Sequence, residues 1–163
     1  MPGGRCGSGE RKYLLHRLAT GKASLDASVI VDFYLAGTLA LLEELFSGRL
    51  LMSDFVKQEL TDADLKLTGV ETTALSSNEE WEFFRNLRRD KPGLGLGKLG
   101  ALAVARFHNA ILVTNDEQAR QAAEEFDVSV HGGIGVLEYA VEVGSFSGLI
   151  VVRRASGPAR SLH

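Results

Sequence analysis

The chain has 163 residues, a formal net charge of −3 and 45% hydrophobic residues, a balance typical of a single domain with a packed core. The negative charge excludes a protein that coats nucleic acid through overall positive charge, so any RNA contact has to come from local patches. Cys6 is the only cysteine, which excludes an internal disulfide or a cysteine-based zinc site. The sequence has neither an apolar run of membrane-spanning length nor a signal-peptide layout, and we therefore expect a cytoplasmic protein.

Residues 1–24 form the first predicted segment. The glycine-rich stretch from Pro2 to Gly9 cannot bury a core, and we expect it to be mobile. One short amphipathic helix is predicted after it, with an apolar face made of Tyr13, Leu14, Leu15 and Leu18. The folded domain is expected over residues 25–152, with an edge strand at 149–152, and residues 153–163 are expected to form a solvated tail.

From residue 25 onward, predicted strands alternate with predicted helices. The strands are expected at 25–31, 49–53, 69–74, 110–114 and 128–131. The helices are expected at 38–46, 54–61, 98–107, 117–126 and 134–143. One further helix follows Ser77, which has Glu80 at the distance of a capping box, and Pro92 ends it. Such alternation requires right-handed crossovers, and it predicts an α/β fold: a three-layer α/β/α sandwich with a central parallel sheet of four or five strands.

Three acids accompany the predicted strands. Asp116 follows Thr114 where a strand ends, and Glu59 lies one turn into the helix after the strand 49–53. Asp26 stands at the head of the apolar run 25–31, so on this interpretation it opens its strand. Each acid also has a plain structural interpretation: Asp26 flanks a strand, Glu59 is a solvated helix residue, and Asp116 is a charge favoured by a helix dipole.

The glycine-rich run from Gly93 to Gly100 invites two nucleotide-binding interpretations. It contains a G-x-G-x-x-G pattern, but a charged segment precedes it instead of the strand that a dinucleotide fold needs. The phosphate-loop template fails too, because Pro92 and Leu99 stand where its glycine and its Ser or Thr belong. We therefore expect these glycines to form a tight turn and to let the next helix pack closely.

The chain from residue 25 to residue 144 resembles the PIN domain family, the fold of many prokaryotic ribonucleases, including the toxins of VapBC-type toxin and antitoxin pairs. The resemblance rests on the glycine turn before a helix and on the element Thr114-Asn115-Asp116 ahead of Ala119 and Arg120. It covers most of the chain. It implies a metal-dependent endoribonuclease that acts on RNA, commonly a homodimer, with an antitoxin as a further protein partner.

The resemblance also implies which residues form the site. The family's acids hold Mg²⁺ or Mn²⁺, and three of them correspond to Asp26, Glu59 and Asp116 as catalytic residues and metal ligands. Thr114 and Asn115 are then second-layer residues or phosphate contacts. The family's remaining acid belongs to the glycine turn, where this chain has Lys98 instead.

Lys98 leaves two functional classes open. Carboxylates suit a hard cation that activates water and neutralises the scissile phosphate, whereas an ammonium at the same place repels it. The chain is then either a metal-dependent ribonuclease with a weakened site or a catalytically inactive PIN-like module that binds RNA or a protein. In the ribonuclease, Lys98 swings out of the site or contacts the phosphate. Our prediction is that the Lys98 ammonium lies in or beside the acidic cleft, where it relieves repulsion between the carboxylates and makes Mg²⁺ binding weak or absent.

Overall fold

The computed structural model describes residues 16–143, and its centre is a parallel sheet with the strand order β3-β2-β1-β4-β5. The predictions for residues 1–15 and for the tail after residue 143 lie outside the described residues. Each strand pairs in parallel with its neighbours, and β1 lies in the middle of the sheet. The strands are β1 (Ala23–Leu25), β2 (Leu50–Ser53), β3 (Val70–Thr73), β4 (Ile111–Val113) and β5 (Val130–His131).

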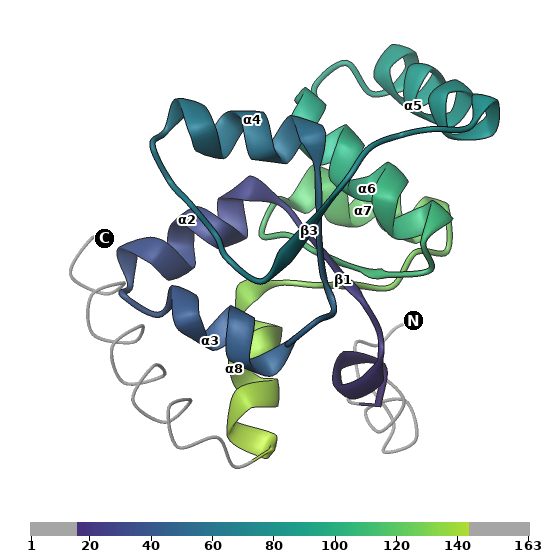
Figure 1. Cartoon of the computed structure of the whole chain (residues 1–163). Coiled ribbons are helices and arrows are strands. Elements are labelled where there is room, and N and C mark those ends of the chain that lie inside the picture. The colour runs from purple at the N-terminus through teal and green to yellow at the C-terminus, as the bar shows by residue number, and fades with distance from the viewer. Residues whose placement is uncertain (1–15, 144–163) are drawn as a thin grey trace.

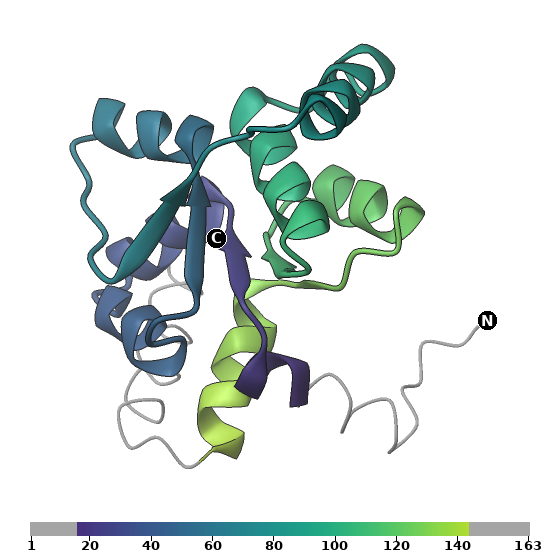
Figure 2. The same cartoon turned by 45° about the vertical axis from the view of Figure 1, so that its right-hand side comes forward.

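Helices cover the sheet on both sides. They are α2 (Ala27–Leu35), α3 (Leu39–Leu45), α4 (Asp54–Asp62), α5 (Asn78–Asp90), α6 (Leu96–Phe107), α7 (Glu117–Glu125) and α8 (Gly133–Glu142). Helix α6 packs against β1, β2 and β4 and is flanked by α5 and α7, while α2, α3 and α8 belong to the opposite side (Figures 1 and 2). The predicted three-layer α/β/α sandwich with a parallel sheet is confirmed, with five strands.

The first predicted strand is wrong, and the error matters for the site. Residues 27–35 form helix α2, and the strand before it covers only Ala23–Leu25. The β-branched run of Val29, Ile30 and Val31 looks strand-like by composition. Its buried positions, however, are Val29, Ile30 and Phe33, which share one helical face. Asp26 therefore ends a strand and starts a helix.

The glycine run is only partly a turn. Helix α6 begins at Leu96, so Gly97 and Gly100 lie inside the helix on its buried side. A β-carbon on Gly100 would come within 2.7 Å of the Phe55 ring and 2.8 Å of Ser53 Oγ. The missing side chains thus let α6 approach α4, and these two helices share extensive contacts. Helix α6 therefore packs closely, as expected, but against helix α4 as well as against the sheet.

The other elements lie close to their predicted bounds, and their caps follow the expected chemistry. Ser77 and Glu80 form the predicted capping box at the start of α5. Ser53 caps α4 by accepting a hydrogen bond from the Val56 amide at 3.1 Å. Across the described residues, no helix is both long and apolar enough to cross a bilayer.

Candidate active site at the carboxyl edge of the sheet

Asp26 is the buried centre of the candidate site. It follows β1 directly, and its backbone amide donates to the Val113 carbonyl of β4 at 3.0 Å, which fixes it between the two central strands. The residue is 1% exposed. Carboxylate oxygen Oδ2 accepts hydrogen bonds from Ser28 Oγ at 2.8 Å and Thr114 Oγ1 at 2.7 Å. The other oxygen, Oδ1, is buried and has no hydrogen-bond partner.

An orphaned carboxylate oxygen is costly, because a buried polar atom normally finds a partner. Ser28 and Thr114 together hold the group in one orientation. The second oxygen, Oδ1, is left without a hydrogen bond. An oxygen in this state is suited to ligate a cation or to accept a proton from a bound water.

Thr114 connects Asp26 to Asp116. The hydroxyl of Thr114, which is fully buried at the end of β4, donates to Asp26 and accepts from the Asp116 backbone amide at 3.1 Å. Asp116 is the N-cap of α7, and its Oδ2 accepts a hydrogen bond from the Ala119 amide at 2.9 Å. Asp116 thus serves at the start of a helix, in line with its plain structural interpretation. The Thr114 hydroxyl also links it to the buried Asp26.

Glu59 approaches the same region from α4. Its carboxylate lies over Gly97 so closely that a β-carbon there would overlap it. Burial against this helix raises the pKa of the Glu59 carboxyl, and the negative charge of Asp26 raises it further. The Asp26 and Glu59 carboxylates are therefore electrostatic neighbours, although Glu59 as a whole residue is exposed.

Lys98 lies at the start of α6, directly after Gly97, over which the Glu59 carboxylate is placed. Its positive charge lowers the pKa of Glu59, opposing the effects of burial and of Asp26. The net direction remains upward. The lysine therefore acts electrostatically on one of the predicted metal ligands, in the direction that stabilises the ionised acids.

A cluster of three acids does not form as the side chains lie. Within residues 16–143, no three His, Cys, Asp or Glu side chains come together in a way that could hold a metal ion. Asp26 is linked to Glu59 by charge and to Asp116 through Thr114. The joint metal site of Asp26, Glu59 and Asp116 stays a prediction.

Asn115 has a structural role beyond the predicted one. Its Nδ2 donates to Asp32 Oδ2 of α2 at 2.7 Å, and its Oδ1 accepts from the Gly133 amide at 2.7 Å. One side chain thereby joins the end of β4 to α2 and to the start of α8. The only trace of this arrangement in the sequence is the pair Gly132 and Gly133. A β-carbon at these positions would lie 3.2 and 3.4 Å from Asn115 Oδ1.

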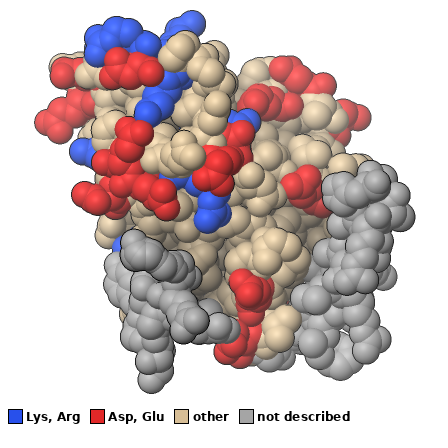
Figure 3. Space-filling model, turned by 180° about the vertical axis from the view of Figure 1, so that it is seen from behind, with Lys and Arg blue, Asp and Glu red and all other residues tan. Residues whose placement is uncertain are grey.

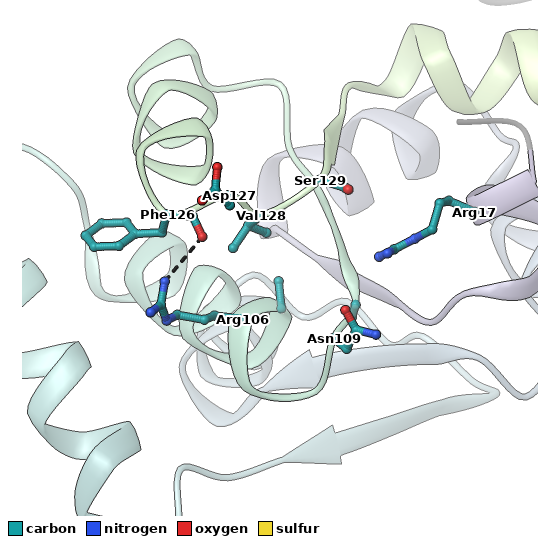
Figure 4. Close-up of a pocket in the computed structure, with 9 residues that line it drawn as sticks. Arg17, Arg106, Asn109, Phe126, Asp127, Val128 and Ser129 are labelled. Carbon is teal, nitrogen blue, oxygen red and sulfur yellow. Dashed lines mark hydrogen bonds between the residues drawn. The ribbon is translucent and has the colours of Figure 1, made fainter. Parts of the chain in front are cut away.

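A separate hollow of about 310 Å³ lies at the opposite edge of the sheet (Figure 4). It is bordered by the residues that precede β4 and β5, among them Asn109 and Ser129. Arg17 and Arg106 reach it from two sides. Arg106 is held by the Phe126 carbonyl and by the Phe83 and Phe126 rings. None of the predicted site residues lines this hollow.

The comparison with protein families settles which family this fold and this acid pattern belong to. A family model described as DUF3368: PIN domain matches residues 23–151, most of the chain. The chain belongs to the PIN domain family. No curated protein sequence matches it significantly.

PIN domains are typically nucleases, generally bind divalent metals such as Mg²⁺, and commonly act on RNA or in toxin–antitoxin pairs. The residues of this PIN domain suit such an ion only in part. The orphaned Asp26 oxygen and the neighbouring Glu59 carboxylate are hard oxygen donors of the kind that Mg²⁺ and Mn²⁺ prefer. Magnesium is often held by one or two carboxylates together with substrate phosphate, which is the number of acids that this pair would supply.

Two contributors to this PIN domain site were not predicted from the sequence. Ser28 stands two residues after Asp26, a spacing at which a serine hydroxyl can reach an aspartate, and this local signal was available. Asp32 is the second contributor, since it accepts a hydrogen bond from Asn115. Its long-range partner could not be inferred before the fold was known.

Proposed function

We propose that this PIN domain is a divalent-metal-dependent endoribonuclease whose metal site is weakened by Lys98. The observation that carries the proposal is the orphaned oxygen of Asp26, buried at the centre of the carboxyl edge and adjacent to Glu59. Open parallel sheets bind their ligands at this edge, where strand order reverses. In the order β3-β2-β1-β4-β5, that point lies between β1 and β4, from which Asp26 and Asp116 emerge.

Asp26 and Glu59 would hold the ion, with Asp116 as the third ligand once its free oxygen turns inward. A bound Mg²⁺ or Mn²⁺ would supply charge neutralisation at the scissile phosphate and a more acidic water. Ser28 and Thr114 keep Asp26 Oδ1 available by occupying Oδ2. The Glu59 carboxylate would also orient the attacking water beside the ion.

A second function, a catalytically inactive module that binds RNA or a protein, is favoured by one observation. Lys98 lowers the pKa of Glu59, so its positive charge favours the ionised form of this acid, as a bound metal ion would. The positive charge of Lys98 would then stabilise the negative charges of Asp26 and Glu59 without a metal ion. Under this alternative the fold keeps its surface and loses turnover.

Family membership alone supports the partners that we propose. These are an RNA substrate, an antitoxin protein and a second copy of the chain in a homodimer. We propose that the protein acts in the cytoplasm, since RNA substrates and antitoxins are found there.

Calorimetric titration with Mn²⁺ of the wild type and of Lys98→Glu separates the two functions. One unit-charge interaction at 4 Å is worth about 4 kcal/mol at an effective dielectric of 20, and solvent reduces this at a partly exposed lysine. We therefore expect Lys98→Glu to bind Mn²⁺ about tenfold more tightly, a change of about 1.4 kcal/mol. Its melting temperature should rise with added Mn²⁺ more than that of the wild type.

Lys98→Gln is the matched control, because it removes the positive charge without adding a ligand. Its affinity should fall between those of the other two proteins. Cleavage of a labelled RNA by the same three proteins then tests turnover. Equal or tighter Mn²⁺ binding by the wild type would show that Lys98 does not weaken the site. Absence of cleavage in all three would favour the binding module.

A further inference from the structure

Arg120 is an unpaired cation at the carboxyl edge of the sheet. It lies on α7, and its backbone amide donates to the Asp116 carbonyl at 3.0 Å, so the two residues stand one helical turn apart on the same face. Arg120 is partly buried. In the described part of the chain, its guanidinium forms neither a hydrogen bond nor an ion pair with any side chain.

The surroundings of this guanidinium are defined by the start of α8. A β-carbon placed on Gly132 would lie 3.3 Å from Arg120 Nη1, 3.2 Å from Asn115 Oδ1 and 3.5 Å from the Thr114 carbonyl oxygen. The guanidinium therefore borders the ends of β4 and β5. His131 lies beside it as well, since the charge of Arg120 contributes to lowering the His131 pKa.

An arginine in such a place normally has an anionic partner. Guanidinium groups at partly buried positions are usually paired with a carboxylate or bind a phosphate through their forked donors. Asp32, one carboxylate that reaches this corner, accepts a hydrogen bond from Asn115, and Asp116 accepts one from the Ala119 amide. The five donors of Arg120 thus remain available to an anion that comes from outside the protein.

The rest of the surface makes a local cation more significant. On the face shown in Figure 3, acidic side chains are widely spread, and the cationic ones gather mainly at the end formed by α5. The whole chain has a net charge of −3. A polyanion gains nothing from the overall charge, so individual guanidinium groups near the site decide where its backbone can lie.

We propose that Arg120 is a phosphate-binding residue that holds the RNA backbone next to the candidate active site. The inference rests on the proposed function for its substrate class, and it assigns to Arg120 the phosphate adjacent to the scissile one. The residue touches the substrate away from the reacting atoms. It contributes binding and register, and it does not supply base recognition.

The test measures RNA binding without turnover. Fluorescence anisotropy of a short labelled single-stranded RNA in EDTA compares the wild type with Arg120→Gln and Arg120→Lys. Loss of one charge-assisted phosphate contact should weaken binding about tenfold in Arg120→Gln, with Arg120→Lys intermediate. The slope of log affinity against log salt should fall by about 0.7 for a single strand.

Arg17→Gln is the matched control, because Arg17 also has an unpartnered buried nitrogen but lies at the opposite edge of the sheet. We expect its RNA affinity to equal that of the wild type. Equal weakening by both variants would reduce the effect to net charge and overturn the proposal. Unchanged binding by Arg120→Gln would also overturn it, and so would a wild type that fails to bind RNA at micromolar concentration. Melting temperatures of all variants exclude loss of folding as the cause.

Failure of the nuclease proposal gives a different result. A wild type that binds RNA through Arg120 but does not cleave it with Mn²⁺ would refute the nuclease and keep the phosphate contact. Conversely, an Arg120→Gln variant that cleaves RNA with unchanged KM would refute the contact and keep the nuclease. In an active enzyme we expect KM to rise and kcat to stay near its wild-type value, because the contact is made equally before and during the reaction.

Discussion

The two edges of the central sheet differ in what they hold: a hollow bordered by arginines lies at one, and a buried acid lies at the other. At the amino edge, a hollow of about 310 Å³ is bordered by Arg17 and Arg106, and Arg106 is fixed by two aromatic rings. At the carboxyl edge, Asp26 is buried with one oxygen free. The hollow and the candidate acid site therefore lie at different ends of this molecule.

Topology explains why the chemistry lies at the carboxyl edge. In a parallel sheet every strand delivers its following residues to the same edge, so β1, β2, β4 and β5 bring together Asp26, the start of α4, Thr114 and Gly132. The amino edge receives only the ends of the preceding helices. Convergence of several chain segments allows a buried acid to be oriented by two hydroxyls.

Asp26→Asn should give the largest difference between the two edges. We expect RNA cleavage with Mn²⁺ to fall at least about a hundredfold, because the substitution removes the charge at the centre of the site. The free energy of unfolding should change by less than about 1 kcal/mol, since the amide keeps one hydrogen-bonding oxygen and no longer buries a charge. The measurements are initial cleavage rates and thermal melting, with Lys98→Glu as the background if the wild type is slow.

Arg17→Gln, at the other edge, is the control for this experiment and should leave the cleavage rate unchanged. An Asp26→Asn variant that keeps its rate within threefold would show that the carboxyl edge is not where the reaction takes place. A loss of cleavage in Arg17→Gln would indicate that the reaction takes place at the hollow of the amino edge.

The sequence predicted the fold better than it predicted the start of the site. The alternating helical and strand patterns and the capping box at Ser77 were enough for the parallel sheet and most element bounds. The run Val29 to Val31 was misread because β-branched residues favour strands by composition, whereas burial of Val29, Ile30 and Phe33 on one face made it a helix. Tertiary packing therefore outweighed the strand preference of these residues.

The contacts within the site could not be predicted, since they join distant parts of the chain. Thr114 lies 88 residues from Asp26, and Asn115 lies 83 residues from Asp32. Without the sheet order, nothing in the sequence says that these side chains meet. Lys98, by contrast, was found by its departure from the family pattern, and its charge does act on Glu59.

Gly97→Ala should weaken Mn²⁺ binding at the carboxyl edge, an effect smaller than that of Asp26→Asn on cleavage. Its β-carbon would overlap the Glu59 carboxylate, which then has to move away from Asp26 and Lys98. Alanine also favours the helix by about 1 kcal/mol, so stability should be kept. We expect Mn²⁺ affinity to fall about tenfold by calorimetry with little change in melting temperature.

Gly95→Ala is the control for the glycine run, because a β-carbon at Gly95 meets no atom within 4 Å. It should leave Mn²⁺ affinity unchanged. Equal losses in the two variants would mean that the run acts through backbone flexibility, and the position of Glu59 over Gly97 would then have no bearing on the metal.

The smallest effect concerns pH. Because the pKa of Glu59 is raised in the folded protein above its ordinary value of 4.5, the folded state binds more protons than the unfolded state between these two pKa values. This group therefore contributes stability at pH below 4.5, and the contribution is lost as pH rises through the folded-state pKa. Metal binding needs the ionised carboxylate, so it should appear over the same rise in pH.

Lys98→Gln should move the Glu59 titration to higher pH, since the variant removes the one positive charge that lowers this pKa and leaves burial and Asp26 unopposed. Carbon-13 NMR of the glutamate carboxyl groups would follow the titration directly. Lys57→Gln is the control, because Lys57 is exposed on the same helix as Glu59 and does not contribute to its pKa shift. A shift of equal size in both variants would mean that the overall charge, and not the position of Lys98 beside Glu59, sets the ionisation of the carboxyl edge.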